Sequence, residues 1–143
     1  NSAPLVASAG LAVGPPALFK AGRRTQEALS CQVLIHLTMR PRGGPVWLKE
    51  AGIPDLVPRG HLWLDSVPAM LEAAEHGLGV TLAMAPLIKA RPGFGKKLIA
   101  PFEVPVSRME TIYLVSRTEQ ARDRRIAAVR RWIAEAVNRA SGK

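Results

Sequence analysis

Short apolar runs along the chain alternate with segments whose apolar residues recur every three or four positions. The apolar runs at 4–13, 31–39 and 79–88, and the alternating run at 61–66, predict β-strands. Helical spacing predicts helices over 67–77 and 119–139, with a shorter one near 43–52 that closes at Gly52. Strands that are apolar throughout and alternate with helices predict an α/β layered sheet.

The remaining segments predict shorter elements. One helical turn fits between the first strand and residue 31, and residues 96–106 predict a short strand that leaves a glycine-rich turn at 92–95. Residues 109–117 alternate as an edge or half-buried strand. The final helix carries arginines on one side and an apolar stripe on the other, made of Ile126, Val129, Ile133, Ala136 and Val137, with Trp132 beside it.

Three predicted strands end in residues suited to holding a ligand. Ligands of layered α/β sheets bind outside the carboxyl ends of the strands, where loops lead into helix N-termini. The helix that begins at Val67 would offer unpaired N–H groups to an anion such as a carboxylate. We expect Thr38, Ser66 and the Val67 amide to hold the anion and the other residues to shape the pocket. The predicted site is Thr38, Met39, Arg40, Ser66, Val67, Ala83 and Met84.

Composition narrows the function classes. The 143 residues suffice for one domain or two small lobes, and 48% hydrophobic with 22% charged residues is typical of a globular protein. The net charge of +9 is spread along the chain without interleaved aromatic residues, which favours solvated faces over a nucleic-acid groove. The single cysteine, Cys31, excludes an intrachain disulfide and indicates a reducing, cytoplasmic setting. No apolar run is long enough to span a bilayer.

Candidate catalytic motifs do not assemble. The stretch "GFGKK" (93–97) has Ala90 where a phosphate loop needs glycine and Lys97 where it needs serine or threonine. The three histidines lack metal-ligand spacing: we expect His36 inside the fold or at a cleft edge, and His76 at a helix C-terminus. Ser66 lacks the flanking glycines of a nucleophile elbow and is expected to cap a helix. We predict no catalytic residue, no metal and no cofactor.

The other residues of interest have structural interpretations. Cys31 is expected to be a small buried hydrophobic residue, and Trp47, Trp63 and Trp132 are expected in the core or at an interface between lobes.

Several stretches taken together resemble one family. In order, "VLIHLTMRPRGGPVWLKEAGI", "HLWLDSVPAMLEAAEHGLGVTLAMAPLI", "KLIAPFEVPV", "IYLVSR" and "IAAVRRWIAEA" are similar to the effector-binding domain of LysR-type transcriptional regulators. The glycine-cleavage-activator branch is the most similar, and the resemblance covers about residues 5–140. It implies a periplasmic-binding-protein-like (type II) fold of two α/β lobes that are joined by two crossing strands, with a small effector between them.

The resemblance also implies a division of the chain. Residues 1–30 would form a crossing strand and its connection, 31–105 a nearly complete second lobe, and 106–143 the return strand and final helix of the first lobe. Family members carry a winged helix-turn-helix ahead of these parts, so we expect a piece of a longer protein that contacts DNA only through that absent domain.

The expected function is regulatory binding of a small anionic effector, of carboxylate or amino-acid type, by a homo-oligomer without membrane contact. Two alternatives remain open: a solute-binding protein of a transport system, and nucleic-acid binding through the arginine-rich final helix.

Overall fold

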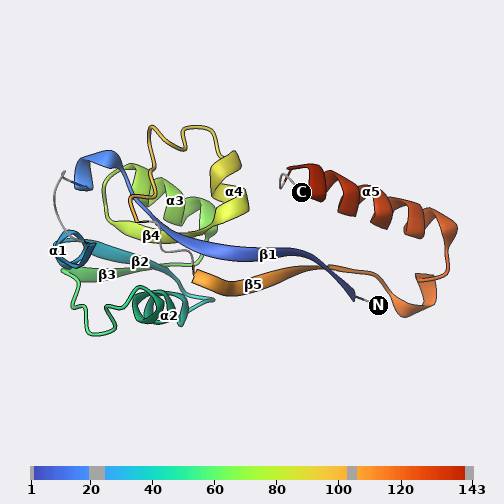
Figure 1. Cartoon of the computed structure of the whole chain (residues 1–143), viewed down its shortest axis with the longest axis horizontal. Helices are drawn as coiled ribbons and strands as arrows, with labels where there is room; N and C mark the ends of the chain where they lie inside the picture. The colour runs from blue at the N-terminus through green and yellow to red at the C-terminus, as the bar shows by residue number, and fades with distance from the viewer. Residues whose placement is uncertain (1, 20–24, 103–105, 141–143) are drawn as a thin grey trace. The chain divides into compact units, whose positions relative to one another are not determined.

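A computed structural model describes residues 2–19, 25–102 and 106–140, and divides the chain into two compact units (Figure 1). Unit 1 comprises Asn1–Ser8 and Glu110–Lys143, and unit 2 comprises Ala9–Met109. Strands β1 (Ser2–Val13) and β5 (Val106–Val115) each run from one unit into the other. The other elements of unit 2 are η1 (Pro16–Leu18), α1 (Thr25–Ser30), β2 (Val33–Leu37), α2 (Gly43–Glu50), β3 (Gly60–Leu64), α3 (Val67–Glu75), β4 (Val80–Met84) and α4 (Ala85–Ala90).

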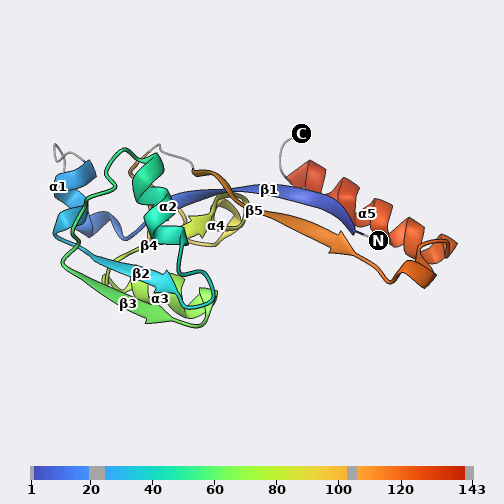
Figure 2. The ribbon, with the colours of Figure 1, turned by 90° about the horizontal axis from the view of Figure 1, so that it is seen from below.

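The five strands form one mixed sheet in the order β3-β2-β4-β1-β5, which confirms the predicted α/β class. Strands β2 and β3 run parallel over five pairs, from Val33 with Gly60 to Leu37 with Leu64, as Figures 1 and 2 show. Strand β2 also runs parallel to β4, with Leu34 beside Val80 and Ile35 beside Thr81. Strand β1 runs antiparallel to β4.

Helices cover both faces of this sheet. Because successive side chains of a strand point to opposite faces, Leu34 and Ile35 of β2 belong to different cores. The core around Leu34 includes Leu29 of α1 and Trp47 of α2. The opposite core, around Ile35, is closed by α3 and α4, which lie above the sheet in Figure 1 while α2 lies below it. These two layers hold the strand ends in place.

At two positions the structure shows a steric reason why glycine is required. Gly52 has a φ of 75° just after α2 and donates its amide to Lys49, as the predicted helix end requires. Gly79 precedes β4, and a Cβ built there would lie 2.2 Å from the carbonyl oxygen of Val33. Only a residue without a Cβ allows β4 to approach β2 this closely.

The start and end of α3 follow their sequence signals. The Ser66 hydroxyl accepts a hydrogen bond from the amide of Ala69 at 3.4 Å, and Pro68 stands in the first turn, where its missing N–H costs nothing. His76 caps the other end, with its Nδ1 2.8 Å from the Glu72 carbonyl oxygen. Both predicted capping positions are confirmed.

Replacement of Ser66 by alanine is expected to lower the free energy of unfolding by about 0.5–1 kcal/mol, because one N-terminal amide of α3 loses its acceptor. The long distance of this bond places the effect at the lower end of the range for N-caps. Chemical denaturation measures the change, and Ser66→Asp, which keeps an acceptor, is the matched control. A loss in Ser66→Asp as large as in Ser66→Ala would contradict the capping role.

Two predicted strands are shorter than expected. The run 79–88 is a strand only as far as Met84; Ala85–Ala90 is helix α4, because Pro86 falls in a first helical turn, where proline is favoured. Within 96–106 the structure has isolated bridges, Gly14 with Ile99 and Phe94 with Leu98, rather than a strand. Residues 103–105 lie outside the described part of the chain.

The C-terminal elements belong to unit 1. After η2 (Thr118–Gln120), α5 (Arg124–Ala140) begins five residues later than predicted, because Asp123 accepts the amide of Arg125 at 2.8 Å. The side chain and amide of Arg125 also lower the pKa of Asp123. No residue of α5 is buried in the described structure, and Val129 of the predicted inward stripe is exposed.

Other packing expectations were confirmed only in part. Cys31 is exposed rather than buried, since it lies in the turn after α1. Trp47 is a core residue as predicted, but Trp63 on the outermost strand of the order is 46% exposed and Trp132 is 64% exposed, so neither belongs to the core.

Candidate functional site

A cavity of about 420 Å³ lies in unit 2 at the carboxyl ends of β2 and β4. Its wall includes Leu37 and Arg40 from the end of β2, and Leu82 and Met84 from the end of β4. The two strands pair as far as Ile35 with Thr81, where the Thr81 hydroxyl donates to the Ile35 carbonyl at 3.0 Å. The paired residues of this ladder also line the cavity, which continues past them to the strand ends.

The position matches a rule for ligand sites in α/β sheets. After β2 the chain turns into α2 on one face, and after β4 it turns into α4 on the other face. Neighbouring parallel strands whose connections leave to opposite faces create a crevice outside their carboxyl ends, and ligands bind there. Residues from α2, α3 and α4 complete the wall, including Trp47, Met70 and Ile88.

Most of the wall is apolar, and its ionisable groups are basic. Besides the aliphatic residues and Trp47, the wall contains His36, Arg40, Thr81 and Arg91. Among the described residues that line the cavity, none is acidic. A volume of this size with few polar groups is typical of a site for a small organic molecule.

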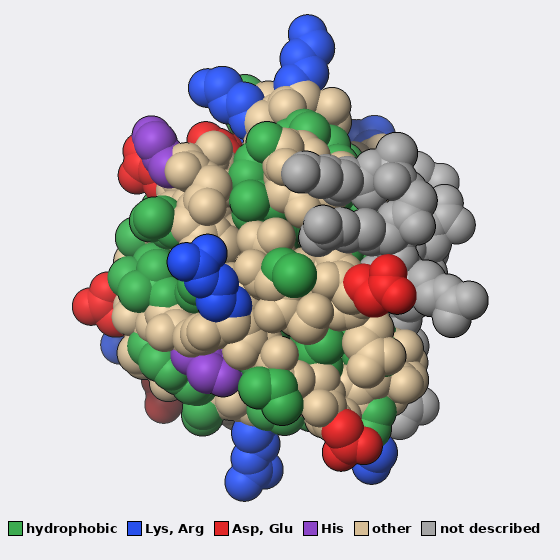
Figure 3. All heavy atoms as spheres, turned by 90° about the vertical axis from the view of Figure 1, so that its left-hand side faces the viewer, with side chains coloured by type: hydrophobic (Ala, Val, Ile, Leu, Met, Phe, Trp, Pro, Cys, Tyr) green, Lys and Arg blue, Asp and Glu red, His purple; other side chains and the backbone are tan. Residues whose placement is uncertain are grey.

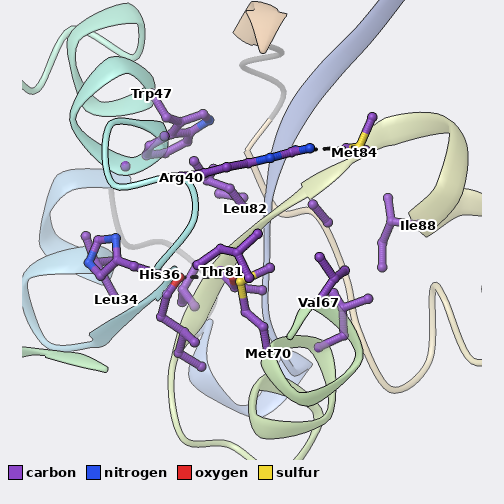
Figure 4. A pocket seen from close by; sticks show the side chains of 18 of the residues that line it. Leu34, His36, Arg40, Trp47, Val67, Met70, Thr81, Leu82, Met84 and Ile88 are labelled. Carbon is purple, nitrogen blue, oxygen red and sulfur yellow. Dashed lines mark hydrogen bonds between the residues drawn. The ribbon is translucent and has the colours of Figure 1, made fainter. Parts of the chain in front are cut away.

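The two arginines of the wall make different contacts. The Nε of Arg91 donates to Glu75 Oε1 at 2.8 Å, so a carboxylate of α3 already balances the Arg91 charge. Arg40 extends across the cavity toward Met84, with Nη1 3.9 Å from the sulfur, as Figure 4 shows. A thioether is a weak acceptor, which a carboxylate would outcompete for a guanidinium. Arg40 therefore presents to the cavity a guanidinium that a carboxylate could bind.

His36 links the cavity wall to the outer strand of the sheet. Its Nε2 lies 2.8 Å from Nδ1 of His61, and its ring stacks on Trp63 with centroids 4.4 Å apart. Burial, and secondarily the nearby His61, lower the pKa of His36, so the ring is neutral near pH 7. Against its other side lies Gly44 of α2, where a Cβ would come within 2.9 Å of the imidazole.

The structure brings together some of the predicted site residues. Arg40, Val67, Ala83 and Met84 line the cavity. Thr38, Met39 and Ser66 are not among the lining residues: the first two are exposed, and the Ser66 hydroxyl is engaged in capping α3. A ligand-binding role for these three residues stays a prediction.

Sequence reasoning missed several residues of the wall, chiefly Trp47, Thr81, Leu87 and Arg91, and placed His36 only as a cleft-edge candidate. Trp47, Leu87 and Arg91 come from helices that follow the strand ends, and no local pattern marks which of their faces meets the cavity. Thr81 stands within a strand, two residues before the predicted tip at Ala83.

The part of the chain that the structure describes contains neither a candidate metal site nor a helix that could span a membrane. No group of three histidine, cysteine or acidic side chains could hold a metal ion there. Among the described residues, no helix has the length and apolar character to cross a membrane. On the face shown in Figure 3, basic side chains lie scattered among acidic ones rather than in one patch.

Residues 1–138 of the chain match the family model of the LysR substrate binding domain. The glycine cleavage system transcriptional activator of Escherichia coli (strain K12) is 32% identical over 111 residues, which is 77% of this chain and 35% of that protein. The chain thus spans about a third of the length of this curated relative.

Solved structures agree on the fold. The effector domain of the transcriptional regulator AmpR of Pseudomonas aeruginosa has a TM-score of 0.80 and 25% identity, covering 99% of this chain and 68% of that one. The AmpR effector-binding domain of Citrobacter freundii also has a TM-score of 0.80, at 17% identity, covering 97% and 68%. The predicted periplasmic-binding-protein-like fold is confirmed, and this chain belongs to the LysR substrate-binding domain family.

Proposed function

We propose that this chain is the effector-sensing part of a bacterial LysR-type regulator, and that its effector is a small carboxylate with an apolar body. The observation that carries the proposal is the cavity at the ends of β2 and β4, whose described wall has Arg40 and no acidic residue. Family membership supports the regulatory role over the transport and nucleic-acid alternatives.

The wall supports this ligand class in three ways. Its volume of about 420 Å³ and its apolar lining suit an aromatic or branched aliphatic group. Arg40, which crosses the cavity toward Met84, would make a charge-assisted bond to the carboxylate. The ammonium group of an amino acid would find no carboxylate in the described wall, and an unpaired buried charge is costly.

Sensing would follow from differential affinity. A ligand that binds one arrangement of the protein more tightly shifts the population toward it, typically with 1–3 kcal/mol of coupling. Residues 31–105 would act as the second lobe, residues 106–143 would complete the first, and the regulator would be a cytoplasmic homo-oligomer without enzymatic activity. Contact with DNA would come from a winged-helix domain outside this chain.

Calorimetric titration with matched pairs of ligands tests the proposal. We expect 3-phenylpropanoate to bind more tightly than phenylalanine, and 4-methylpentanoate more tightly than leucine, by about tenfold or more because of the unpaired ammonium. Tighter binding of the amino acids would reject the ligand class while leaving a sensing role, whereas no binding of any of the four would reject both.

A further inference from the structure

The histidine pair beside the cavity has no part in the function proposed above. We infer that an anion entering the cavity is bound together with one proton, which the His36–His61 pair takes up from water. This inference rests on the proposed function, since it needs an anionic ligand in that cavity. It adds a proton-linked step that the ligand class alone does not require.

The geometry connects the cavity with bulk water through two rings. His36 is 8% exposed and belongs to the cavity wall, while His61 on β3 is exposed and does not line it. The 2.8 Å separation of Nε2 and Nδ1 is a hydrogen bond in which one ring donates and the other accepts. A proton that arrives at the exposed ring is therefore one hydrogen bond away from the buried ring.

The pair can accept one proton without losing its contact. In the neutral pair one N–H donates to a bare nitrogen, and in the singly protonated pair an imidazolium makes the same bond with charge assistance. A second proton would remove the acceptor and break the bond. The face of Trp63, stacked on His36, also favours an imidazolium there.

In the empty cavity the surroundings oppose that proton. The first turn of α2 lies against His36 at Gly44 and carries the positive end of the helix dipole. Arg40, from the loop before α2, lines the same cavity, and so does Arg91, whose charge Glu75 balances. Burial lowers the pKa of His36 below its ordinary value, and a charge on His61, when that ring holds the proton, lowers it further. An incoming anion offsets the positive charge of Arg40 and raises that pKa.

The pH dependence follows from these directions. When ligand binding raises the pKa of a group, binding takes up protons between the free and bound values, and affinity falls as the pH rises through that window. Below the free value the pair is already protonated, and above the bound value it stays neutral in the complex. The affinity for an anion is thus expected to weaken by up to about tenfold per pH unit around the ordinary histidine value of about 6.5.

Calorimetry of 3-phenylpropanoate at pH about 6.5, in PIPES, ACES and Bis-Tris buffers, measures the proton directly. The slope of the apparent binding enthalpy against the ionisation enthalpy of the buffer gives the protons exchanged. We expect an uptake of about 0.3–1 proton per ligand for the wild-type chain and near zero for His36→Asn. The matched control is His76→Asn, since His76 is an exposed histidine at the end of α3, and it should keep the wild-type uptake.

The His61→Asn variant tests whether the pair, rather than His36 alone, takes up the proton. This variant leaves the cavity wall intact and removes the ring that would accept a hydrogen bond from the protonated His36, so the proton uptake at pH about 6.5 should fall below the wild-type value. It also carries the test if circular dichroism shows that His36→Asn does not fold. Ligand binding without proton uptake, or wild-type uptake in either His36→Asn or His61→Asn, would overturn the inference and leave the sensing function standing. No binding of 3-phenylpropanoate would overturn this inference, and the sensing function would fall with it only if none of the other three ligands binds either.

Discussion

Gly79→Ala is expected to destabilise the fold by about 3 kcal/mol or more, a large part of the total stability of an ordinary domain. The added Cβ would lie 2.2 Å from the carbonyl oxygen of Val33 and 3.2 Å from a side-chain carbon of Ile35. The first of these neighbours is backbone of β2, which is held between β3 and β4 and has no free rotation with which to move away. Relief would require β4 to separate from β2, at the pairs that form the floor of the cavity.

Gly60→Ala is the matched control. Gly60 also faces Val33, but a Cβ at this position would meet a side-chain methyl carbon at 3.8 Å, an ordinary contact distance. Urea denaturation of both variants measures the difference, and we expect a change within about 0.5 kcal/mol for Gly60→Ala. Equal stability of the two variants would show that β4 does not approach β2 as closely as the structure has it.

Arg40→Gln is expected to weaken the binding of 3-phenylpropanoate by about 10- to 100-fold, because a charge-assisted hydrogen bond contributes about 1.5–3 kcal/mol. Glutamine keeps a polar side chain of similar reach, so the loss reports mainly the guanidinium charge and its paired donors. Affinity for the matched amide, 3-phenylpropanamide, should change little, since that ligand carries no charge for Arg40 to balance.

Arg42→Gln makes the same change of charge two residues away. Arg42 is exposed, precedes α2 and does not line the cavity, so its replacement should alter the affinity by no more than about twofold. Similar losses in both variants would mean that the ligand responds to the general positive charge of the chain rather than to a bond with Arg40. That result would remove the proposed anion site.

The candidate site was only partly predictable. The rule that ligands bind at strand ends selected Arg40, Val67, Ala83 and Met84, all of which line the cavity. The same rule also selected Thr38 and Met39, which are exposed and outside the wall. Position at a strand end is a matter of local sequence, but the direction in which a loop residue points depends on the neighbouring chain.

The ends of helices and strands also divide into those that local sequence predicts and those that it does not. Ser66, Pro68 and His76 act within one turn of α3, so their effects could be inferred from the sequence around them. The apolar run after Met84 would suit a strand or a helix; in the structure it is α4, with Pro86 in its first turn and Ile88 in the core shared with α3. Apolar runs of this length do not distinguish the two by pattern alone.

The sequence by itself determined the elements whose causes are local: the caps of α3, the end of α2 at Gly52, the strands β2 and β3, and the α/β class that follows from their alternation. The tertiary structure alone decided what depends on distant segments meeting. It placed β4 beside β2 in a short ladder, and it set Arg40 across the cavity from Met84 and His36 against His61. The physical reason is distance along the chain. Arg40 and Met84 are 44 residues apart and His36 and His61 are 25 residues apart, so only the packed sheet brings each pair together.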